Sequence, residues 1–114
     1  MSTLSTHVLD TAHGQPAAGV AIVLTGPSGE VLFAGKTNAD GRCPGLPQLA
    51  PPLEPGRYRL SFAVADYFSA RGVALPDPPF LDVIAIDFGI ADAQGHCHVP
   101  LLVSPFAYST YRGS

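Results

Sequence analysis

Prolines and glycines interrupt this sequence so often that a long helix cannot form in it. The chain has twelve of each in 114 residues, and residues 44–56 alone contain five prolines and two glycines. Proline lacks the backbone N–H that a helix interior or a central strand requires. We therefore expect an irregular loop over 44–56, with at most a brief edge strand, and short elements on both sides of it.

Between these interruptions, apolar and polar residues alternate with the period of two that is typical of β-strands. The alternation is clearest at 57–64, which predicts a strand with one face in the core and one face in water. The other predicted strands cover residues 4–10, 20–25, 30–35, 80–88 and 96–104. One short helical stretch is predicted at 65–72, ended by Gly72. Seven or eight short strands with almost no helix indicate an all-β sandwich.

The last nineteen residues, 96–114, have the pattern of a hairpin that is built into the fold. In an extended chain, one face of the first half is apolar and consists of Cys97, Val99, Leu101 and Val103. His96 and His98 lie on the opposite face beside further apolar residues, which indicates a surface covered by something other than water. After a turn at Ser104 and Pro105 the alternation resumes and ends in the tetrapeptide Tyr-Arg-Gly-Ser.

Length and charge exclude several classes of protein. A chain of 114 residues predicts one domain spanning residues 1–114. Charged residues make up 13% of the sequence, against roughly 25% in typical soluble domains, so we expect part of the surface to be buried in an oligomer. A net charge of −3 argues against nucleic acid as a partner. The apolar runs are too short for a spanning helix and the start lacks a signal-peptide pattern, so we expect a cytoplasmic protein without membrane contact.

The two cysteines and one of the histidines are predicted to have structural roles. Cys97 falls on the apolar face of its strand, and Cys43 lies in a loop without a neighbouring histidine. Two cysteines are too few for a disulfide framework, so both are expected to be reduced thiols without catalytic function. His13 belongs to a predicted turn at 13–16.

The remaining histidines and an arginine are the candidates for chemistry. His96 and His98, about 7 Å apart on one strand face, form a zinc site only if a third ligand such as His7 lies alongside. A serine-histidine-aspartate triad has no G-x-S-x-G turn to hold it. Two histidines with Arg42 suit hydrolysis better, because a neutral imidazole accepts a proton from water and a guanidinium stabilises a developing oxyanion. This chemistry requires neither metal nor cofactor.

Four stretches carry a resemblance to a known family: LSTHVLD, GQPAAGV, TNADGR and HVPLLVSPFAYSTYRGS. They resemble the 5-hydroxyisourate hydrolases, the transthyretin-related enzymes of urate breakdown in purine metabolism. The resemblance implies a transthyretin-like Greek-key β-sandwich of two four-stranded sheets with one short helix, assembled as a homotetramer (a dimer of dimers) with active sites in the channel between dimers. It also implies hydrolysis of 5-hydroxyisourate to 2-oxo-4-hydroxy-4-carboxy-5-ureidoimidazoline. The sequence departs from the family pattern at Cys97, where an aromatic residue is usual, and at Phe106-Ala107, where Tyr-Gly is common.

The resemblance also implies which residues form the site. The catalytic set is His7, Arg42, His98 and Ser114, and the substrate-binding set is His7, Arg42, Tyr111 and Arg112. His98 is expected to hold or deprotonate the attacking water, and Arg42 to bind a substrate carbonyl. His7 is expected either to contact substrate or to act as the general base. His96 is either a wet strand residue or a support for the site.

The terminal tetrapeptide leaves more than one interpretation open. Tyr111 either packs at the end of the last strand or lines the pocket. Arg112 either contacts substrate or pairs with a carboxylate such as Asp82 or Asp87. Ser114 is expected to bring a hydroxyl and the α-carboxylate into the site, and either it or a protonated imidazole supplies a proton to the departing nitrogen.

Two other functional classes compete with the hydrolase. A small-molecule carrier of the transthyretin type would bind in the same channel without reacting. A purely structural β-sandwich module would be indifferent to replacement of His98. The Tyr-Arg-Gly-Ser end and the set His7, Arg42 and His98 argue against the carrier.

Overall fold

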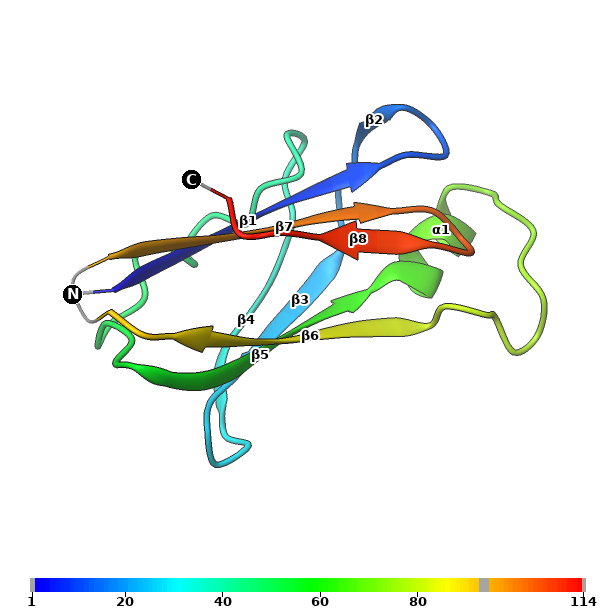
Figure 1. Ribbon diagram of the computed structural model, residues 1–114. Helices are drawn as coiled ribbons and strands as arrows, with labels where there is room; N and C mark the ends of the chain where they lie inside the picture. The colour runs from blue at the N-terminus through cyan, green and yellow to red at the C-terminus, as the bar shows by residue number, and fades with distance from the viewer. Residues whose placement is uncertain (1, 93–94, 114) are drawn as a thin grey trace.

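The computed structural model describes residues 2–92 and 95–113 and consists of two β-sheets packed face to face (Figure 1). Its elements are β1 (Thr3–Asp10), β2 (Gln15–Pro16), β3 (Ala21–Thr25), β4 (Val31–Lys36), β5 (Gly56–Ala63), α1 (Val64–Ala70), β6 (Val83–Ile90), β7 (His96–Val103) and β8 (Tyr108–Thr110). The predicted sandwich of two four-stranded sheets with one short helix is confirmed. Among the described residues, no helix is long and apolar enough to cross a membrane.

The two sheets have the strand orders β2-β1-β7-β8 and β4-β3-β5-β6. Strands β1 and β7 pair in parallel over their whole length, whereas the other strand pairs are antiparallel. The strands predicted at 20–25 and 30–35 are present as β3 and β4 and pair antiparallel as a hairpin. In Figure 1 the first strand and the last long strand therefore lie side by side at the centre of one sheet.

The core lies between the sheets and is filled by the alternate residues that the pattern assigned to it. On β1 and β7 the inward side chains include Leu4, Val8, Val99 and Leu101, all buried. They face buried side chains of the other sheet, of which Phe62 is fully enclosed. Complete burial of one Leu or Phe side chain stabilises the folded state by about 1.5–3 kcal/mol. The alternation therefore decides which residues of β1 and β7 remain on the outer face of their sheet.

The predicted helix and loop are present, and one strand boundary was wrong. Helix α1 covers Val64–Ala70 and is followed by Gly72 at φ 84°. Residues 44–55 form no regular strand; their only described pairing is an isolated bridge from Leu53 to Ser2. The strand expected at 80–88 begins instead at Val83. The Asp82 carbonyl accepts the first two backbone N–H groups of α1, each at 3.1 Å, so it serves the helix start and not the sheet.

A buried carboxylate joins the end of β1 to α1. The side chain of Asp10 is fully enclosed and accepts hydrogen bonds from the Tyr67 hydroxyl at 2.7 Å and from the backbone N–H of His13 at 3.0 Å. The imidazole Nδ1 of His13 lies 2.6 Å from the same carboxylate, so the predicted turn residue also has a structural bond. Burial raises the pKa of Asp10, but these hydrogen bonds outweigh burial and hold the pKa below its ordinary value.

Candidate active site

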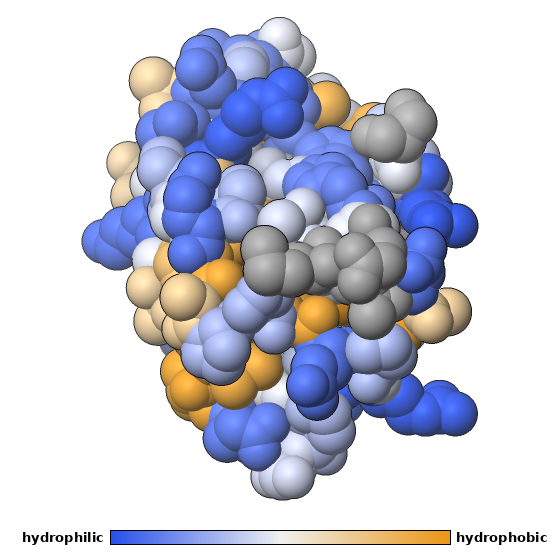
Figure 2. All heavy atoms as spheres, turned by 90° about the vertical axis from the view of Figure 1, so that its left-hand side faces the viewer, coloured by the Kyte–Doolittle hydropathy of each residue, from blue (hydrophilic) through white to orange (hydrophobic). Residues whose placement is uncertain are grey.

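The candidate site lies on the outer face of the β2-β1-β7-β8 sheet, which is turned away from the core. The parallel register pairs Ser5 with His98 and His7 with Pro100. Outward residues of the two neighbouring strands therefore form one polar row. In Figure 2, hydrophilic residues predominate in the upper half of the molecule, on the side where this sheet lies. The prediction that His98 faces away from the core is confirmed, because Val99, its neighbour on the opposite face, is buried and His98 is only half-buried.

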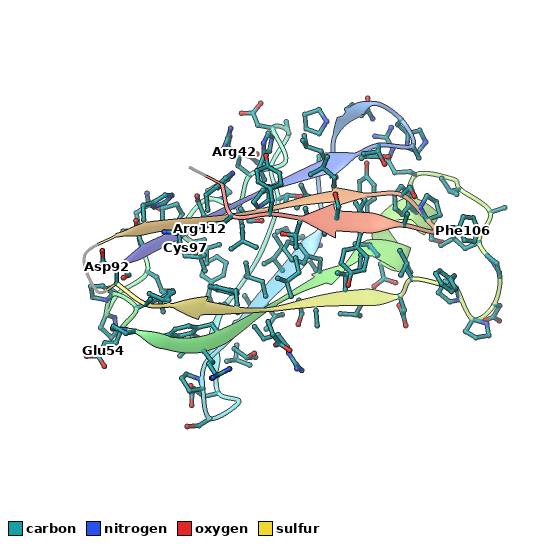
Figure 3. The ribbon with its side chains drawn as sticks, viewed as in Figure 1. Arg42, Glu54, Asp92, Cys97, Phe106 and Arg112 are labelled. Carbon is teal, nitrogen blue, oxygen red and sulfur yellow. The ribbon has the colours of Figure 1, made fainter. Side chains whose placement is uncertain are left out.

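Arg42 reaches the site because the turn before it is fastened to β1. The Gly41 carbonyl accepts the backbone N–H of Val8 at 2.8 Å, and Arg42 forms a bridge with His7. Gly41 has φ 76°, and a Cβ atom there would lie 2.4 Å from the Val8 carbonyl oxygen. Only glycine permits this approach. Figure 3 shows Arg42 on the outer side of this sheet, above β1.

Asn38 organises the same turn and was not among the predicted site residues. Its side-chain Oδ1 accepts the backbone N–H groups of Asp40 at 3.0 Å and Arg42 at 3.1 Å. Its backbone N–H also donates to the Arg42 carbonyl at 2.7 Å. Asn and Asp side chains commonly hold turns in this way. The sequence TNADG is typical of a turn. The dependence of Arg42 on Asn38 becomes visible only from the contacts in the folded structure.

The turn also fixes the protonation of His7. Its Nε2 atom lies 2.8 Å from the Asp40 carbonyl oxygen. A carbonyl oxygen only accepts hydrogen bonds, so Nε2 of His7 carries a proton. In the neutral imidazole, Nδ1 then keeps its lone pair. His7 can accept a proton or a hydrogen bond through Nδ1 and is held at Nε2.

The terminal segment pairs with β7 at His98, beside which Gly113 lies. The Gly113 N–H donates to the His98 carbonyl at 2.9 Å, and a Cβ atom on Gly113 would lie 2.4 Å from His98 Cδ2. The structure thus brings Gly113 of the predicted tetrapeptide to the predicted histidine. Tyr111 and Arg112 lie in the same segment and are both exposed. Ser114 lies outside the described residues.

Arg112 lies near Cys97, whose side chain packs against the core from the apolar face of β7, as Figure 3 indicates. Burial raises the pKa of the Cys97 thiol and the positive charge of Arg112 lowers it, with burial the larger effect. A thiol with a raised pKa is a poor nucleophile, in keeping with the predicted structural role. Asp87, one of the two carboxylates considered for Arg112, is bound by Arg59 through two hydrogen bonds of 2.7 and 3.1 Å.

The surroundings of His98 lower the pKa of its imidazole. Burial lowers its pKa most, and the positive charge of Arg42 and the neighbouring His96 and His7 lower it further. Its Nδ1 atom lies 2.7 Å from the Ser5 hydroxyl. His98 is therefore neutral at neutral pH, which is the form that a general base requires.

His96 is exposed and bound through both ring nitrogens. Its Nε2 atom lies 2.8 Å from the Ser5 hydroxyl, and its Nδ1 atom contacts the Thr3 hydroxyl. Within 2–92 and 95–113, no group of three His, Cys, Asp or Glu side chains is placed to hold a metal ion. The zinc arrangement of His7, His96 and His98 is thus not formed by these residues.

Ser5 was also missed by the sequence interpretation. Alternation puts it on the face of His7, but its contact with His98 depends on the parallel pairing of β1 with β7. Local patterns carry no information about strand pairing across more than ninety residues. Taken together, the site offers a neutral imidazole at His98, a second imidazole at His7 and a guanidinium at Arg42 on one sheet face.

Comparison with known proteins places this geometry in a family. A sequence profile described as the HIUase/Transthyretin family matches residues 4–113. The chain is 52% identical to a 5-hydroxyisourate hydrolase of Ralstonia nicotianae over the full length of both chains. It is 50% identical to a 5-hydroxyisourate hydrolase of Pseudomonas aeruginosa, covering 100% of this chain and 93% of the relative.

Solved structures of proteins in this family are also similar to this chain. A 5-hydroxyisourate hydrolase of Klebsiella pneumoniae is similar with a TM-score of 0.85 and 41% identity over the whole of both chains. An (S)-allantoin synthase is similar with a TM-score of 0.92 and 39% identity; the match covers 99% of this chain but only 44% of that one. Sea bream transthyretin in complex with thyroxine follows with a TM-score of 0.81 and 30% identity, covering 96% of this chain and 93% of that one. By sequence and by fold, this chain belongs to the HIUase/transthyretin family.

Proposed function

We propose that this protein is a hydrolase that converts 5-hydroxyisourate to 2-oxo-4-hydroxy-4-carboxy-5-ureidoimidazoline in urate degradation. The observation that carries the proposal is the neutral, half-buried His98 beside Arg42 and His7 on one sheet face. The 5-hydroxyisourate hydrolases that are about 50% identical over their full length support it.

The proposed reaction is attack of water on the lactam carbonyl of the six-membered ring. His98 accepts a proton from the water through Nε2 while the oxygen forms a bond to the carbonyl carbon. Arg42 stabilises the resulting oxyanion with its planar pair of N–H donors. Collapse of the intermediate breaks the carbon–nitrogen bond, and the proton held by His98 passes to the departing nitrogen. Atoms and charges balance, with one water consumed.

The other predicted residues take supporting roles in this proposal. His7 offers Nδ1 as an acceptor toward the substrate, because its Nε2 is occupied by the Asp40 carbonyl. Tyr111 and Arg112 are exposed on the segment that pairs with His98, and we assign them to substrate binding. Ser114, which lies outside the described residues, stays the predicted alternative to His98 as the donor of this proton.

A transthyretin-type carrier is the alternative, and the likeness to the thyroxine-bound sea bream protein is the observation in its favour. The polar row argues against it. Ser5, His7, His96 and His98 line the outer face of β1 and β7. Such a face suits a polar heterocycle that undergoes acid–base chemistry better than a largely apolar ligand.

The molecule is also proposed to be a single domain that assembles as a cytoplasmic homotetramer, a dimer of dimers. Strands β6 and β8 are at sheet edges, and large apolar side chains stand exposed on or near them. These side chains are Phe80, Val83, Phe106 and Tyr108, exposed by 71%, 58%, 61% and 47%. Exposed edges with apolar side chains favour association with a second copy. Light scattering coupled to size-exclusion chromatography tests this proposal, and a monomer at micromolar concentration would contradict it.

The decisive experiment for the activity is the ultraviolet decay of freshly generated 5-hydroxyisourate, compared with its spontaneous rate. The parent protein is expected to accelerate the decay, and His98→Ala to lose most of the acceleration. Lys36→Ala, which changes an exposed residue of β4 in the other sheet, is the matched control and should retain it. No acceleration by the folded parent would reject the hydrolase and leave a carrier.

A further inference from the structure

Four side chains of β1 and β7 form an unbroken chain of hydrogen bonds that ends at His98. The Thr3 hydroxyl contacts Nδ1 of His96, Nε2 of His96 lies 2.8 Å from the Ser5 hydroxyl, and the same hydroxyl lies 2.7 Å from Nδ1 of His98. The parallel register of the two strands, which are side by side in Figure 1, aligns these residues. Within residues 2–92 and 95–113, the Ser5 hydroxyl is the group that hydrogen-bonds to both imidazoles.

The Ser5 hydroxyl has one proton, and this restricts how both histidines are protonated. A hydroxyl that contacts two ring nitrogens donates to one of them and accepts from the other. If Nδ1 of His98 donates to Ser5, then Ser5 donates to Nε2 of His96, and Nδ1 of His96 donates to Thr3. All three bonds then have one donor and one acceptor, and Nε2 of His98 is unprotonated. The reverse direction satisfies the same three bonds but places a proton on Nε2, so it does not supply the base that the proposed reaction requires.

The proposed reaction requires this unprotonated nitrogen as its base. Cδ2 of His98, the ring atom bonded to Nε2, is the atom that Gly113 approaches from the terminal segment. The groups acting electrostatically on His98 are Arg42, His96 and His7. Ser5 thus contacts the Nδ1 edge of the ring, while Gly113 of the terminal segment lies against the Cδ2 edge.

We propose that Ser5 is a positioning residue that holds His98 in the tautomer with Nδ1 protonated and Nε2 free, with His96 receiving the Ser5 proton. The inference rests on the proposed function, because it assigns Ser5 to the general base of that reaction. Ser5 does not touch the substrate. It acts by orienting the imidazole, as hydrogen-bonded partners of catalytic and metal-binding histidines commonly do.

Three variants of the neighbouring residues Ser5 and Thr6 separate this role from a structural one. Ser5→Ala removes the hydroxyl between the histidines, and Ser5→Thr restores it with a side chain that suits a strand. Thr6→Val is the matched control. It removes a hydroxyl that donates to the Val99 carbonyl at 2.6 Å, which joins the same two strands but touches no histidine.

The first measurement is the tautomer of His98, read from nitrogen chemical shifts of protein labelled with nitrogen-15 in histidine, above the pH at which His98 titrates. We expect Nδ1 of His98 to be protonated in the parent, in Ser5→Thr and in Thr6→Val, and a substantial Nε2-protonated population in Ser5→Ala. The same tautomer in Ser5→Ala as in the parent would overturn the inference. This measurement does not depend on any activity.

The second measurement is the rate of 5-hydroxyisourate hydrolysis. We expect kcat of Ser5→Ala to fall about 10- to 100-fold with little change in KM, and Ser5→Thr to recover most of it. A kcat within about twofold of the parent would overturn the inference. If the parent itself does not hydrolyse the substrate, the proposed function fails, and the tautomer measurement alone decides the role of Ser5.

Should Ser5→Ala fail to fold, His96→Phe provides the test, because His96 is exposed and its replacement leaves the core unchanged. Without His96, the Ser5 hydroxyl is free to donate to Nδ1 of His98. We therefore expect a mixture of the two His98 tautomers and a smaller fall in kcat. A single tautomer identical to that of the parent would contradict the proposed participation of His96.

Discussion

Gly113 and His98 lie so close that a Cβ atom on the glycine would stand 2.4 Å from Cδ2 of the imidazole. The backbone bond from the Gly113 N–H to the His98 carbonyl, at 2.9 Å, holds the terminal segment at that distance. The glycine of the terminal tetrapeptide is therefore explained by the size of the histidine ring beneath it. Any larger residue has to displace either the segment or the ring.

Gly113→Ala is expected to reduce kcat/KM at least about tenfold, because a displacement of about 1 Å near reacting groups is costly. The free energy of unfolding should change little, since the segment is at the surface. The matched control is Gly89→Ala on β6, where an added Cβ meets nothing nearer than 4.0 Å. Hydrolysis and urea unfolding are to be measured for both. Equal activity of the two variants would contradict this account of Gly113.

The charge of Arg42 should be visible in the titration of His98. Burial and Arg42 both lower the pKa of His98 from 6.5, so the ring is neutral above its lowered pKa and protonated below it. Replacing Arg42 by Gln removes one of the causes, and the pKa of His98 should rise. The pH below which hydrolysis falls should rise with it. A nuclear magnetic resonance titration of His98 checks this in the parent and in Arg42→Gln.

Arg57→Gln serves as the control for that titration. Arg57 is an exposed residue of β5, in the other sheet, and is not among the groups that act on His98. Its replacement should leave the pKa of His98 unchanged. An equal rise in both variants would mean that net charge, and not the position of Arg42, sets the pKa.

The turn that carries Arg42 should depend on the acceptor oxygen of Asn38. Asn38→Ala removes the partner of two backbone N–H groups, and we expect a higher KM and a lower kcat because Arg42 loses its fixed position. Asn38→Asp keeps an acceptor oxygen in the same place and should recover most of the activity. Steady-state kinetics of both variants test this prediction. Failure of Asn38→Asp to recover activity would count against the role of Asn38 in holding the turn.

The buried carboxylate of Asp10 should make the free energy of unfolding depend on pH in the acidic range. Its pKa is lower in the folded protein than its ordinary value of 3.8, so it contributes stability above pH 3.8 that is lost as the pH falls below that value. Tyr67→Phe removes a hydrogen bond to this charge and should lower the free energy of unfolding at neutral pH by about 1.5–3 kcal/mol. Urea unfolding at neutral and acidic pH measures the difference, which should shrink in acid.

Tyr58→Phe is the control for this prediction, because the Tyr58 hydroxyl donates to an uncharged partner, the Glu54 carbonyl, at 2.6 Å. Loss of this hydrogen bond should lower the free energy of unfolding by about 0.5–1.5 kcal/mol. That cost should not change between neutral and acidic pH. A loss in Tyr67→Phe that is equally independent of pH would show that Asp10 does not carry the effect.

Alternation predicted much of the fold, because the period of side chains along a strand is a local property. It assigned His98 to the outer face of β7 and Val99 to the core correctly. The start of β6 was wrong, because the Asp82 carbonyl binds the first N–H groups of α1, a contact that alternation does not encode. Local patterns predict faces well and boundaries less well.

The candidate site was predicted in part, and the missing part has a common cause. The family motifs identified His7, Arg42 and His98, and the structure brings these three together. Ser5 and Asn38 were missed because their importance lies in contacts with residues of other elements. Both lie in the stretches LSTHVLD and TNADGR, but the spacing of residues in these stretches does not specify a contact partner. Such supporting residues become visible only when strand pairing and turn contacts are known.

The parallel pairing of β1 with β7 has a consequence for how this protein is made. Ser5 and His98, which meet in the site, are separated by 93 positions in the sequence. Contacts between residues this far apart form late, because the intervening chain must be ordered before the two strands meet. During synthesis, β1 leaves the ribosome long before its partner exists. The proposed active site is then absent until β7 has been synthesised and has paired with β1.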